Sequence, residues 1–528
     1  MTDPPEATSV SSAEAPDRRI APLRARRPIR WLLRLLFGAL ALAWLVGALW
    51  ISQKRLPPGL HVVGPWRPLP AQSLHFVRDV TAADAHGVPI VEPQIDVELL
   101  RLISEARELV VLDTGLFGDL PAAGPGASQL RAPPPVASGL IDALLSARAR
   151  QPAMSILVLI DPSSLRVGRL QPQLQRMRAA GVTVLSVDVE QLRAPDPAFS
   201  ALWSLCCAWW THALNAGDWP NPLGVGPASV SLDVWGSLQG YQRSHRQLLI
   251  ADDGAGRLEG LVFSRPLHSE AGIHSATALE LSGSALEPLL ESEFAVAQFS
   301  GWSDGGVTQA RSQRLLEQQR RAELPETQFN ARARVVTEAA IAETLVARID
   351  ASGKGDQVEI AALYLSQREL LRALLDAARR GVQVRVLLDP GKDGYGYERA
   401  GIPNREVASE LIAASDGAIR VRWYRTHGEQ FSPGFVLVQS PRDCWLMLGT
   451  AELTRYDLGD FNLSAAVQAE LPSNAEASVE ALAWFDRLWY NRASNGTEYT
   501  SDVDVYADAS QLRYWQYRLL EASGMSFY

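Results

Sequence analysis

The same succession of strand and helix patterns occurs twice along the 528 residues, and this repeat constrains the fold more than any other feature. In the first copy, the apolar runs RELVVLD (107–113) and SILVLID (155–161) have the length of strands, and VASGLIDALLSARAR (136–150) between them has helical spacing. The stretch LQRMRAAGVTVLSVD (174–188) then reads as helix, glycine and strand. Continuous apolar strands joined by helices are typical of a parallel or mixed sheet that is covered on both faces.

The second copy repeats this order. DQVEIAALYL (356–365) matches the first strand, and ELLRALLDAARRGVQVRVLLD (369–389) matches the helix and the second strand. VASELIAASDGAIRVRWY (407–424) matches the next helix and the third strand. SPGFVLVQS (432–440) then falls where HRQLLIADD (245–253) fell in the first copy.

A repeat of this length indicates a duplicated domain rather than a solenoid. We therefore predict an α/β fold with two α/β/α sandwich halves, residues 71–325 and 326–528, packed with pseudo-twofold symmetry. Two such halves that meet face to face would form one composite site at their interface.

A long apolar segment precedes the repeat. WLLRLLFGALALAWLVGALWI (31–51) is interrupted only by Arg34, and its last 17 residues would span roughly 25 Å as a helix. Six arginines precede it, whereas only Lys54 and Arg55 follow closely. We expect a cytoplasmic disordered tail (1–30), a transmembrane anchor (31–51) and a Pro-rich extended linker (55–70), with the main domain across the membrane. A cleaved signal peptide is the alternative.

Composition narrows the functional classes. The formal net charge is −9, so no basic excess points to nucleic acid, and we expect no nucleic-acid partner. The three cysteines, Cys206, Cys207 and Cys444, include no CxxC pair. Because sequence neighbours rarely bridge each other, neither a disulfide framework nor a metal site is predicted.

Each half contains a degenerate form of one motif. SHRQLLIADD (244–253) in the first half and THGEQF (426–431) with GTAELTRYDLGDFNL (449–463) in the second are similar to segments of the phospholipase D superfamily. Members carry H-x-K-x₄-D followed by a G-S-x-N-like turn in each half. The resemblance covers about residues 70 to 500 and is strongest to a membrane-anchored bacterial group. It implies a bacterial inner-membrane protein with a single span and a periplasmic main domain.

The resemblance also implies the chemistry. One histidine attacks phosphorus and gives a phosphohistidine intermediate, and the histidine of the other half protonates the leaving oxygen. A lysine beside each histidine neutralises the phosphoryl oxygens, and an aspartate after each strand orients an imidazole. Neither a metal nor another cofactor is required, and the expected partner is a phospholipid or a membrane surface.

In the first half, His245 and Asp252 stand at the histidine and aspartate positions, but Gln247 replaces the lysine. Ser264 matches the serine of the following turn, and Pro266 takes the place of its asparagine. This half therefore keeps its histidine and lacks its cation.

The second half has lost more. Ser432, Gly434 and Gln439 occupy the histidine, lysine and aspartate positions. Gly449 and Thr450 keep the turn, but Glu452 replaces its asparagine. Further candidates for substrate binding are His268 in the first half and Arg455 in the second.

Two hypotheses remain open from the residues alone. One is a catalytically impaired phosphodiesterase or phosphatidyltransferase, and the other is a non-catalytic protein that binds lipid headgroups or a protein partner. The apolar stretch FSALWSLCCAWW (199–210) has two interpretations as well: a lip that contacts lipid, or a buried helix.

Overall fold

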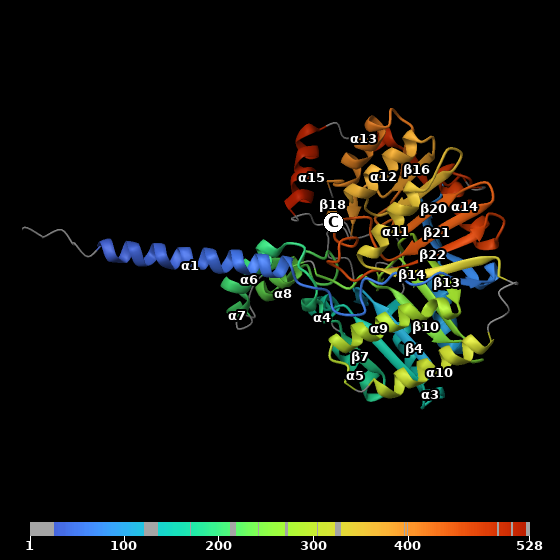
Figure 1. The fold of residues 1–528 in the computed structure, drawn as a ribbon, viewed down its shortest axis with the longest axis horizontal. Helices are drawn as coiled ribbons and strands as arrows, with labels where there is room; N and C mark the ends of the chain where they lie inside the picture. Colours follow the sequence, from blue (N-terminus) through green and yellow to red (C-terminus); the bar gives the residue numbers. More distant parts are fainter. Residues whose placement is uncertain are drawn as a thin grey trace, which may run out of the picture.

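The computed structural model describes residues 26–120, 136–168, 170–211, 218–240, 242–269, 273–303, 305–322, 329–394, 397–398, 400–493, 496–507 and 510–523. Its main body contains two large sheets with helices on their outer faces, and one long helix projects from it (Figure 1). Each sheet is built from one copy of the sequence repeat.

The first sheet has the strand order β3-β2-β13-β11-β10-β4-β6-β7. Strands β4, β6 and β7 are parallel and the rest pair antiparallel, so the sheet is mixed. The bounds are β2 (Leu74–Ala83), β3 (Pro89–Glu92), β4 (Leu109–Thr114), β6 (Ser155–Ile160), β7 (Thr183–Ser186), β10 (Leu248–Asp252), β11 (Leu258–Phe263) and β13 (Ala276–Ser282). The main helices of this half are α2 (Ile95–Glu105), α3 (Val136–Arg150), α5 (Gln171–Ala179), α9 (Glu287–Phe299) and α10 (Gly306–Ala322).

The second sheet has the order β1-β14-β22-β21-β20-β15-β16-β19-β23. Its bounds are β1 (Arg67–Leu69), β14 (Ala331–Thr337), β15 (Gln357–Ala362), β16 (Gln383–Leu388), β19 (Ile419–Tyr424), β20 (Phe435–Gln439), β21 (Asp443–Gly449), β22 (Ala465–Pro472) and β23 (Thr500–Asp502). The main helices here are α11 (Ala339–Asp350), α12 (Arg368–Arg379), α13 (Asn404–Ala414), α14 (Glu476–Trp489) and α15 (Gln511–Ser523).

The two sheets match strand by strand. The order β2-β13-β11-β10-β4-β6-β7 in the first corresponds to β14-β22-β21-β20-β15-β16-β19 in the second. The predicted fold class, a duplicated α/β sandwich, is therefore confirmed. Aromatic residues of both halves pack at the interface: the ring centroid of Phe76 lies 6.2 Å from that of Phe435 and 5.8 Å from that of Trp484.

Backbone hydrogen bonds tie each motif to the opposite half. The N–H of His245 donates to the carbonyl of Leu463 at 2.8 Å. In a related way, the N–H of Ser432 donates to the carbonyl of Ser275 at 2.9 Å, and the N–H of Ser275 donates to the carbonyl of Gln430 at 3.1 Å. Backbone hydrogen bonds alone therefore hold both motif segments between the halves.

The connector that follows the first helix, residues 55–70, is bonded to the second half. The N–H of His61 donates to the Glu338 carboxylate at 2.8 Å, and the Val62 N–H donates to the Thr337 hydroxyl at 2.8 Å. Strand β1 then joins the second sheet through β14. Residues 55–70, expected as an extended spacer, are thus packed against the second half.

Helix α1 (Arg26–Ser52) contains the segment Arg30–Ser52, which is long and apolar enough to cross a membrane. It packs against α6 (Pro197–Cys206), and the Trp44 indole N–H donates to the Ala198 carbonyl at 2.8 Å. Helices α6, α7 (Ala208–Thr211) and α8 (Leu232–Gln239) gather around the end of α1 that meets the body (Figure 1).

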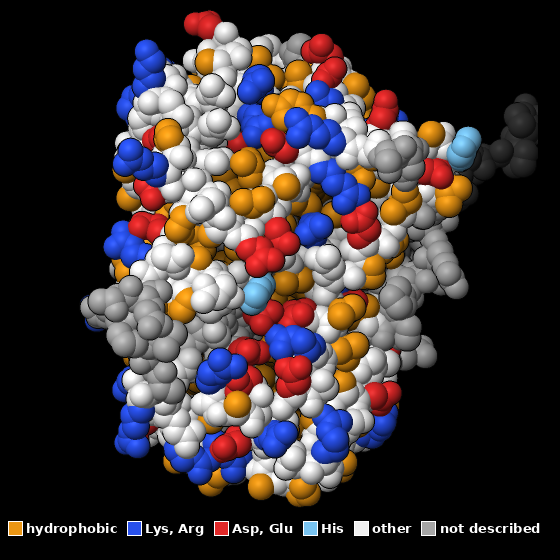
Figure 2. Space-filling view, turned by 90° about the vertical axis from the view of Figure 1, so that its right-hand side faces the viewer, with side chains coloured by type: hydrophobic (Ala, Val, Ile, Leu, Met, Phe, Trp, Pro, Cys, Tyr) orange, Lys and Arg blue, Asp and Glu red, His pale blue; other side chains and the backbone are white. Residues whose placement is uncertain are grey.

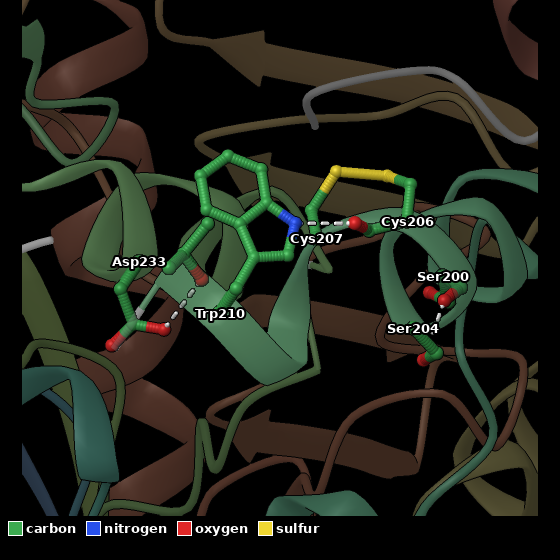
Figure 3. Close-up of a disulfide and its surroundings, with 7 residues drawn as sticks. Ser200, Ser204, Cys206, Cys207, Trp210 and Asp233 are labelled. Carbon is green, nitrogen blue, oxygen red and sulfur yellow. Dashed lines mark hydrogen bonds between the residues drawn. A yellow bond between two sulfur atoms is a disulfide. The ribbon is translucent and has the colours of Figure 1, made fainter. Parts of the chain in front are cut away.

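The expectation that the cysteines form no disulfide is wrong. Cys206 and Cys207 are joined by a disulfide between sequence neighbours at the junction of α6 and α7 (Figure 3). The Trp210 indole N–H donates to the Cys206 carbonyl at 2.5 Å beside it. Cys444 is buried and unpaired.

The halves are also joined by a buried charge. The Arg246 guanidinium is fully buried and donates to Glu293 at 2.7 Å in its own half and to Glu338 at 2.8 Å in the other. Removing one partner of such a group leaves buried charges without compensation, which costs about 3–5 kcal/mol. We expect Arg246→Met to lower the free energy of unfolding by about that amount, measured by denaturant titration of the purified protein.

The matched control is Arg257→Met, because Arg257 pairs with Asp253 while its own side chain is 63% exposed. An exposed ion pair contributes little. Equal stability of the two variants would contradict a structural role of the buried network.

Candidate active site

A cavity of about 240 Å³ lies where the two motif segments meet. Its lining includes Asp161, His245 and Gln247 from the first half, and Ser432, Glu452 and Asp457 from the second. His245 and Ser432, which the repeat predicts at equivalent positions, therefore line the same cavity. Each half supplies one wall of it.

His245 is paired with an aspartate of the opposite half. Its Nδ1 lies 2.9 Å from a carboxylate oxygen of Asp457, and about one third of the imidazole is exposed while Asp457 is buried. Burial opposes the charged imidazolium, but the charge and hydrogen bond of Asp457 outweigh it and raise the pKa of His245 above its ordinary value. Because Nδ1 is occupied, Nε2 is the ring nitrogen left for a ligand.

Other groups hold Asp457 in place. The Asn462 side-chain amide donates to one carboxylate oxygen at 2.8 Å, and the Glu452 backbone N–H donates to the other at 2.9 Å. The Asn462 carbonyl oxygen in turn accepts from the Arg243 N–H at 3.0 Å. The His245–Asp457 pair is therefore positioned by hydrogen bonds that run from Asp457 through Asn462 to the backbone of Arg243, two residues before His245.

The Glu452 carboxyl differs from that of Asp457 in its pKa, which is raised. One of its oxygens accepts from the Tyr364 N–H at 3.2 Å. Burial, and then the neighbouring charge of Asp457, raise the pKa of Glu452 to about 8. At neutral pH this carboxyl is largely protonated, so it is a hydrogen-bond donor in the cavity rather than a negative charge.

Comparisons with known proteins agree with this architecture. A family model described as "Cardiolipin synthase, PLD-like domain" matches residues 345–489. Among solved structures, phosphatidylserine synthase from Haemophilus influenzae Rd KW20 superposes with a TM-score of 0.50 at 10% identity, covering 88% of this chain and 96% of that one. Residues 345–489 therefore match a phospholipase D-like domain, and the chain as a whole shares its fold with phosphatidylserine synthase.

Two further structures match with lower TM-scores. Polyphosphate kinase from Porphyromonas gingivalis has a TM-score of 0.40 and 11% identity, covering 88% of this chain and 57% of that one. The phospholipase D family member Nuc from Salmonella typhimurium has a TM-score of 0.22 and 15% identity, covering 33% of this chain and 97% of that one. No curated protein matches the chain by sequence.

The first half has one of its motif positions, Gln247, in the cavity and another, Asp252, away from it. Gln247, at the lysine position, lines the cavity, and its amide N–H donates to the His245 carbonyl at 3.3 Å. Asp252 does not orient an imidazole, so that expectation is wrong. Its carboxylate accepts from the N–H groups of Glu108 and Leu109 at 2.8 Å. It lies at the far end of β10, about 20 Å from His245 along the strand.

In the second half, the lysine position is closed. Gly434 has φ +53°, and a Cβ built there would lie 2.2 Å from the Gly449 carbonyl oxygen. No L side chain fits that position without moving the backbone of the turn. Gln439, at the aspartate position, lies at the far end of β20 and outside the cavity lining. Ser432 lines the cavity, and its hydroxyl is buried without a hydrogen-bond partner.

The turns that follow the motifs are structural in both halves. The Ser264 hydroxyl accepts from the Thr277 N–H at 3.0 Å, and the Thr450 hydroxyl accepts from the Ala465 N–H at 3.1 Å. Both residues line the cavity. Gly449, expected to bind substrate, is instead closely packed, since a Cβ there would lie 2.5 Å from that of Ala466.

Two of the expected substrate-binding residues lie elsewhere. His268 is fully buried outside the cavity lining, and burial followed by the charge of Arg265 lowers its pKa to about 3. Arg455 lines a separate surface pocket beside α15, with its guanidinium 4.8 Å from the Phe461 ring. The expectation that His268 and Arg455 bind substrate in this cavity is therefore wrong.

Sequence reasoning missed the residues that position His245. Asp457 and Asn462 lie in the quoted stretch TRYDLGDFNL, but their partner is more than two hundred residues away, so spacing could not reveal it. Asp161 ends a predicted strand, and its carboxylate accepts from the Ser244 N–H at 2.7 Å. Within the described part of the chain, no group of three or more His, Cys, Asp or Glu side chains is placed to hold a metal ion.

The pairing predicts how His245 titrates. In Asp457→Asn the counter-charge is absent and burial remains, so we expect the pKa of His245 to fall below its ordinary value of 6.5. The measurement is an NMR titration of the His245 imidazole.

Asp252→Asn is the control, because Asp252 bonds only to backbone groups at the far end of β10. It should leave the pKa of His245 unchanged. A shift of equal size in both variants would show that the imidazole responds to something other than Asp457.

Proposed function

We propose that the chain is a membrane-anchored phospholipase D-like protein that binds a phosphodiester headgroup between its halves and hydrolyses phospholipid negligibly. The observation that carries this proposal is the second half of the cavity. Ser432 stands at the histidine position, and Gly434 leaves no room for a lysine side chain. The chain thus has one half of a two-histidine site.

The loss is large in kinetic terms. A positioned general acid contributes about 10²–10⁴ in rate. Removing a donor that stabilises the transition state costs about another 10²–10³. These effects do not add simply, but together they remove most of the acceleration that two complete motifs would supply.

The cavity's charges suit a singly charged ligand. Its basic side chains are Arg243, His245 and His274. Its acidic ones are Asp161, Glu452 and Asp457, of which Glu452 is largely neutral. A phosphodiester carries one negative charge and can accept hydrogen bonds from the imidazolium and from the Gln247 amide. The named relative phosphatidylserine synthase also supports a phospholipid as the ligand class.

Binding and turnover can be separated by experiment. We expect the full-length protein to bind short-chain phosphatidylglycerol or phosphatidylcholine by calorimetry, and to release headgroup no faster than His245→Ala. Gln247→Glu adds a negative charge to the cavity and should weaken binding about tenfold. Gln439→Glu makes the same exchange at the far end of the equivalent strand and should have little effect.

Two results would overturn the proposal. One is equal weakening by the two glutamate variants, or binding by none of the proteins. The other is headgroup release at enzymatic rates that His245→Ala abolishes.

A second candidate function is a slow hydrolase, and Glu452 is the observation in its favour. A protonated carboxyl in the same cavity as the His245–Asp457 pair could protonate the leaving oxygen while the neutral form of His245, with its Nδ1–H held by Asp457, attacks phosphorus through Nε2. Any residual turnover would then disappear in Glu452→Gln and decline as the pH rises past about 8. Turnover that ignores both changes would exclude this candidate.

The anchor belongs to the same proposal. The apolar helix Arg30–Ser52 follows the arginine-rich N-terminal segment, which favours a cytoplasmic N-terminus and a main domain in the periplasm. We expect a C-terminal alkaline phosphatase fusion to be active in bacterial cells. A C-terminal reporter that works only in the cytoplasm would contradict this topology.

A further inference from the structure

Several large apolar side chains are exposed around the base of α1. On α6 and α7, Leu202 is 53% exposed, Leu205 42% and Trp209 75%. The interpretation of this stretch as a buried helix is therefore wrong. On the side of the molecule opposite to α1, basic, acidic and apolar side chains are intermixed across both halves (Figure 2).

The position of α6 along α1 sets its depth. Gly47 of α1 faces Ala201, since a Cβ on the glycine would lie 3.4 Å from that of Ala201, and Trp44 bonds to Ala198. At 1.5 Å per residue, these contacts lie about 8–12 Å before the end of α1 at Ser52. The 23 residues of Arg30–Ser52 would span about 34 Å, little more than the hydrocarbon core of a bilayer.

It follows that α6 cannot stay in water if α1 crosses the membrane. A helix that touches α1 at that height lies within the interfacial layer or the outer acyl chains. Its sequence, PAFSALWSLC, contains no charged residue. Aromatic residues collect here as well: the Trp203 ring centroid lies 6.5 Å from that of Trp235, which lies 5.2 Å from that of Trp219. Tryptophan is the residue that prefers the bilayer interface.

Helix α15 presents a second apolar stripe at the same end of the molecule. Leu512, Trp515 and Leu519 are 79%, 66% and 67% exposed, and their spacing places them on one helical face. In Figure 1, α15 lies on the side of the body from which α1 projects and runs across the direction of α1. This is the orientation of an amphipathic helix that lies in the plane of a membrane surface.

We propose that α6–α7 and the exposed stripe of α15 form a membrane-docking surface that contacts the same leaflet as the end of α1. The inference rests on the proposed anchor and adds a second, independent bilayer contact. Trp219, beside this surface, is followed in the chain by Pro222 and Leu223, which line the His245 cavity. The segment that carries Trp219 therefore links the proposed docking surface to one wall of the cavity.

Depth-dependent fluorescence quenching tests this in the full chain. Leu202→Cys, Leu519→Cys and Val479→Cys each receive an environment-sensitive fluorophore, because the native cysteines are either paired or buried. Val479 lies on α14 and is 51% exposed, so it matches Leu202 in residue class and exposure. The proteins are reconstituted in phosphatidylcholine–phosphatidylglycerol vesicles that contain doxyl-labelled lipid.

We expect quenching at positions 202 and 519 to be about threefold greater than at 479, as for side chains inserted at an interface. If the protein floats with the vesicles but position 202 is quenched no more than 479, the docking surface is overturned and the anchor stands. If the protein does not float with the vesicles, the anchor and the docking surface both fall.

Discussion

The two halves depend on a positive charge that neither could bury alone. Arg246 is fully buried next to His245 in sequence, and its guanidinium bonds to Glu293 of the first half and Glu338 of the second. A charge in such a position requires compensation from both sides. The Glu338 carboxylate also accepts from the His61 N–H of the connector, so one cluster joins both sheets and the segment that follows α1.

The cavity likewise depends on contacts between residues of the two halves. His245 comes from the first half, whereas Asp457 and Asn462, which hold it, come from the second. The second half does not repeat this arrangement: Ser432 stands opposite with its hydroxyl unbonded, and Gly434 packs against the carbonyl of Gly449 in the turn. The cavity therefore holds a His–Asp pair on one side and a serine on the other, and the proposed loss of turnover rests on this asymmetry.

Several residues show where inference from motifs fails. Asp252 keeps the family spacing, yet spacing along a strand says nothing about which end of the strand holds the site. The carboxylate satisfies the N–H groups of residues 107–109, and this role explains its position without any chemistry. Arg455 lies in the stretch that resembles the family's second turn, but its side chain lines a pocket beside α15 instead of the His245 cavity. The packing of α15 sets this direction, and the local sequence does not show it.

The sequence by itself determined the duplication, the order of strands and helices, the apolar helix and the position of His245. Those features follow from local periodicity, which is written in consecutive residues. Only the tertiary structure decided that Asp457 is the partner of His245, that the pKa of Glu452 is raised to about 8 and that α6 lies exposed beside α1. Each of these depends on contacts between residues far apart in the chain, where burial and neighbouring charge are set by packing that no local pattern records.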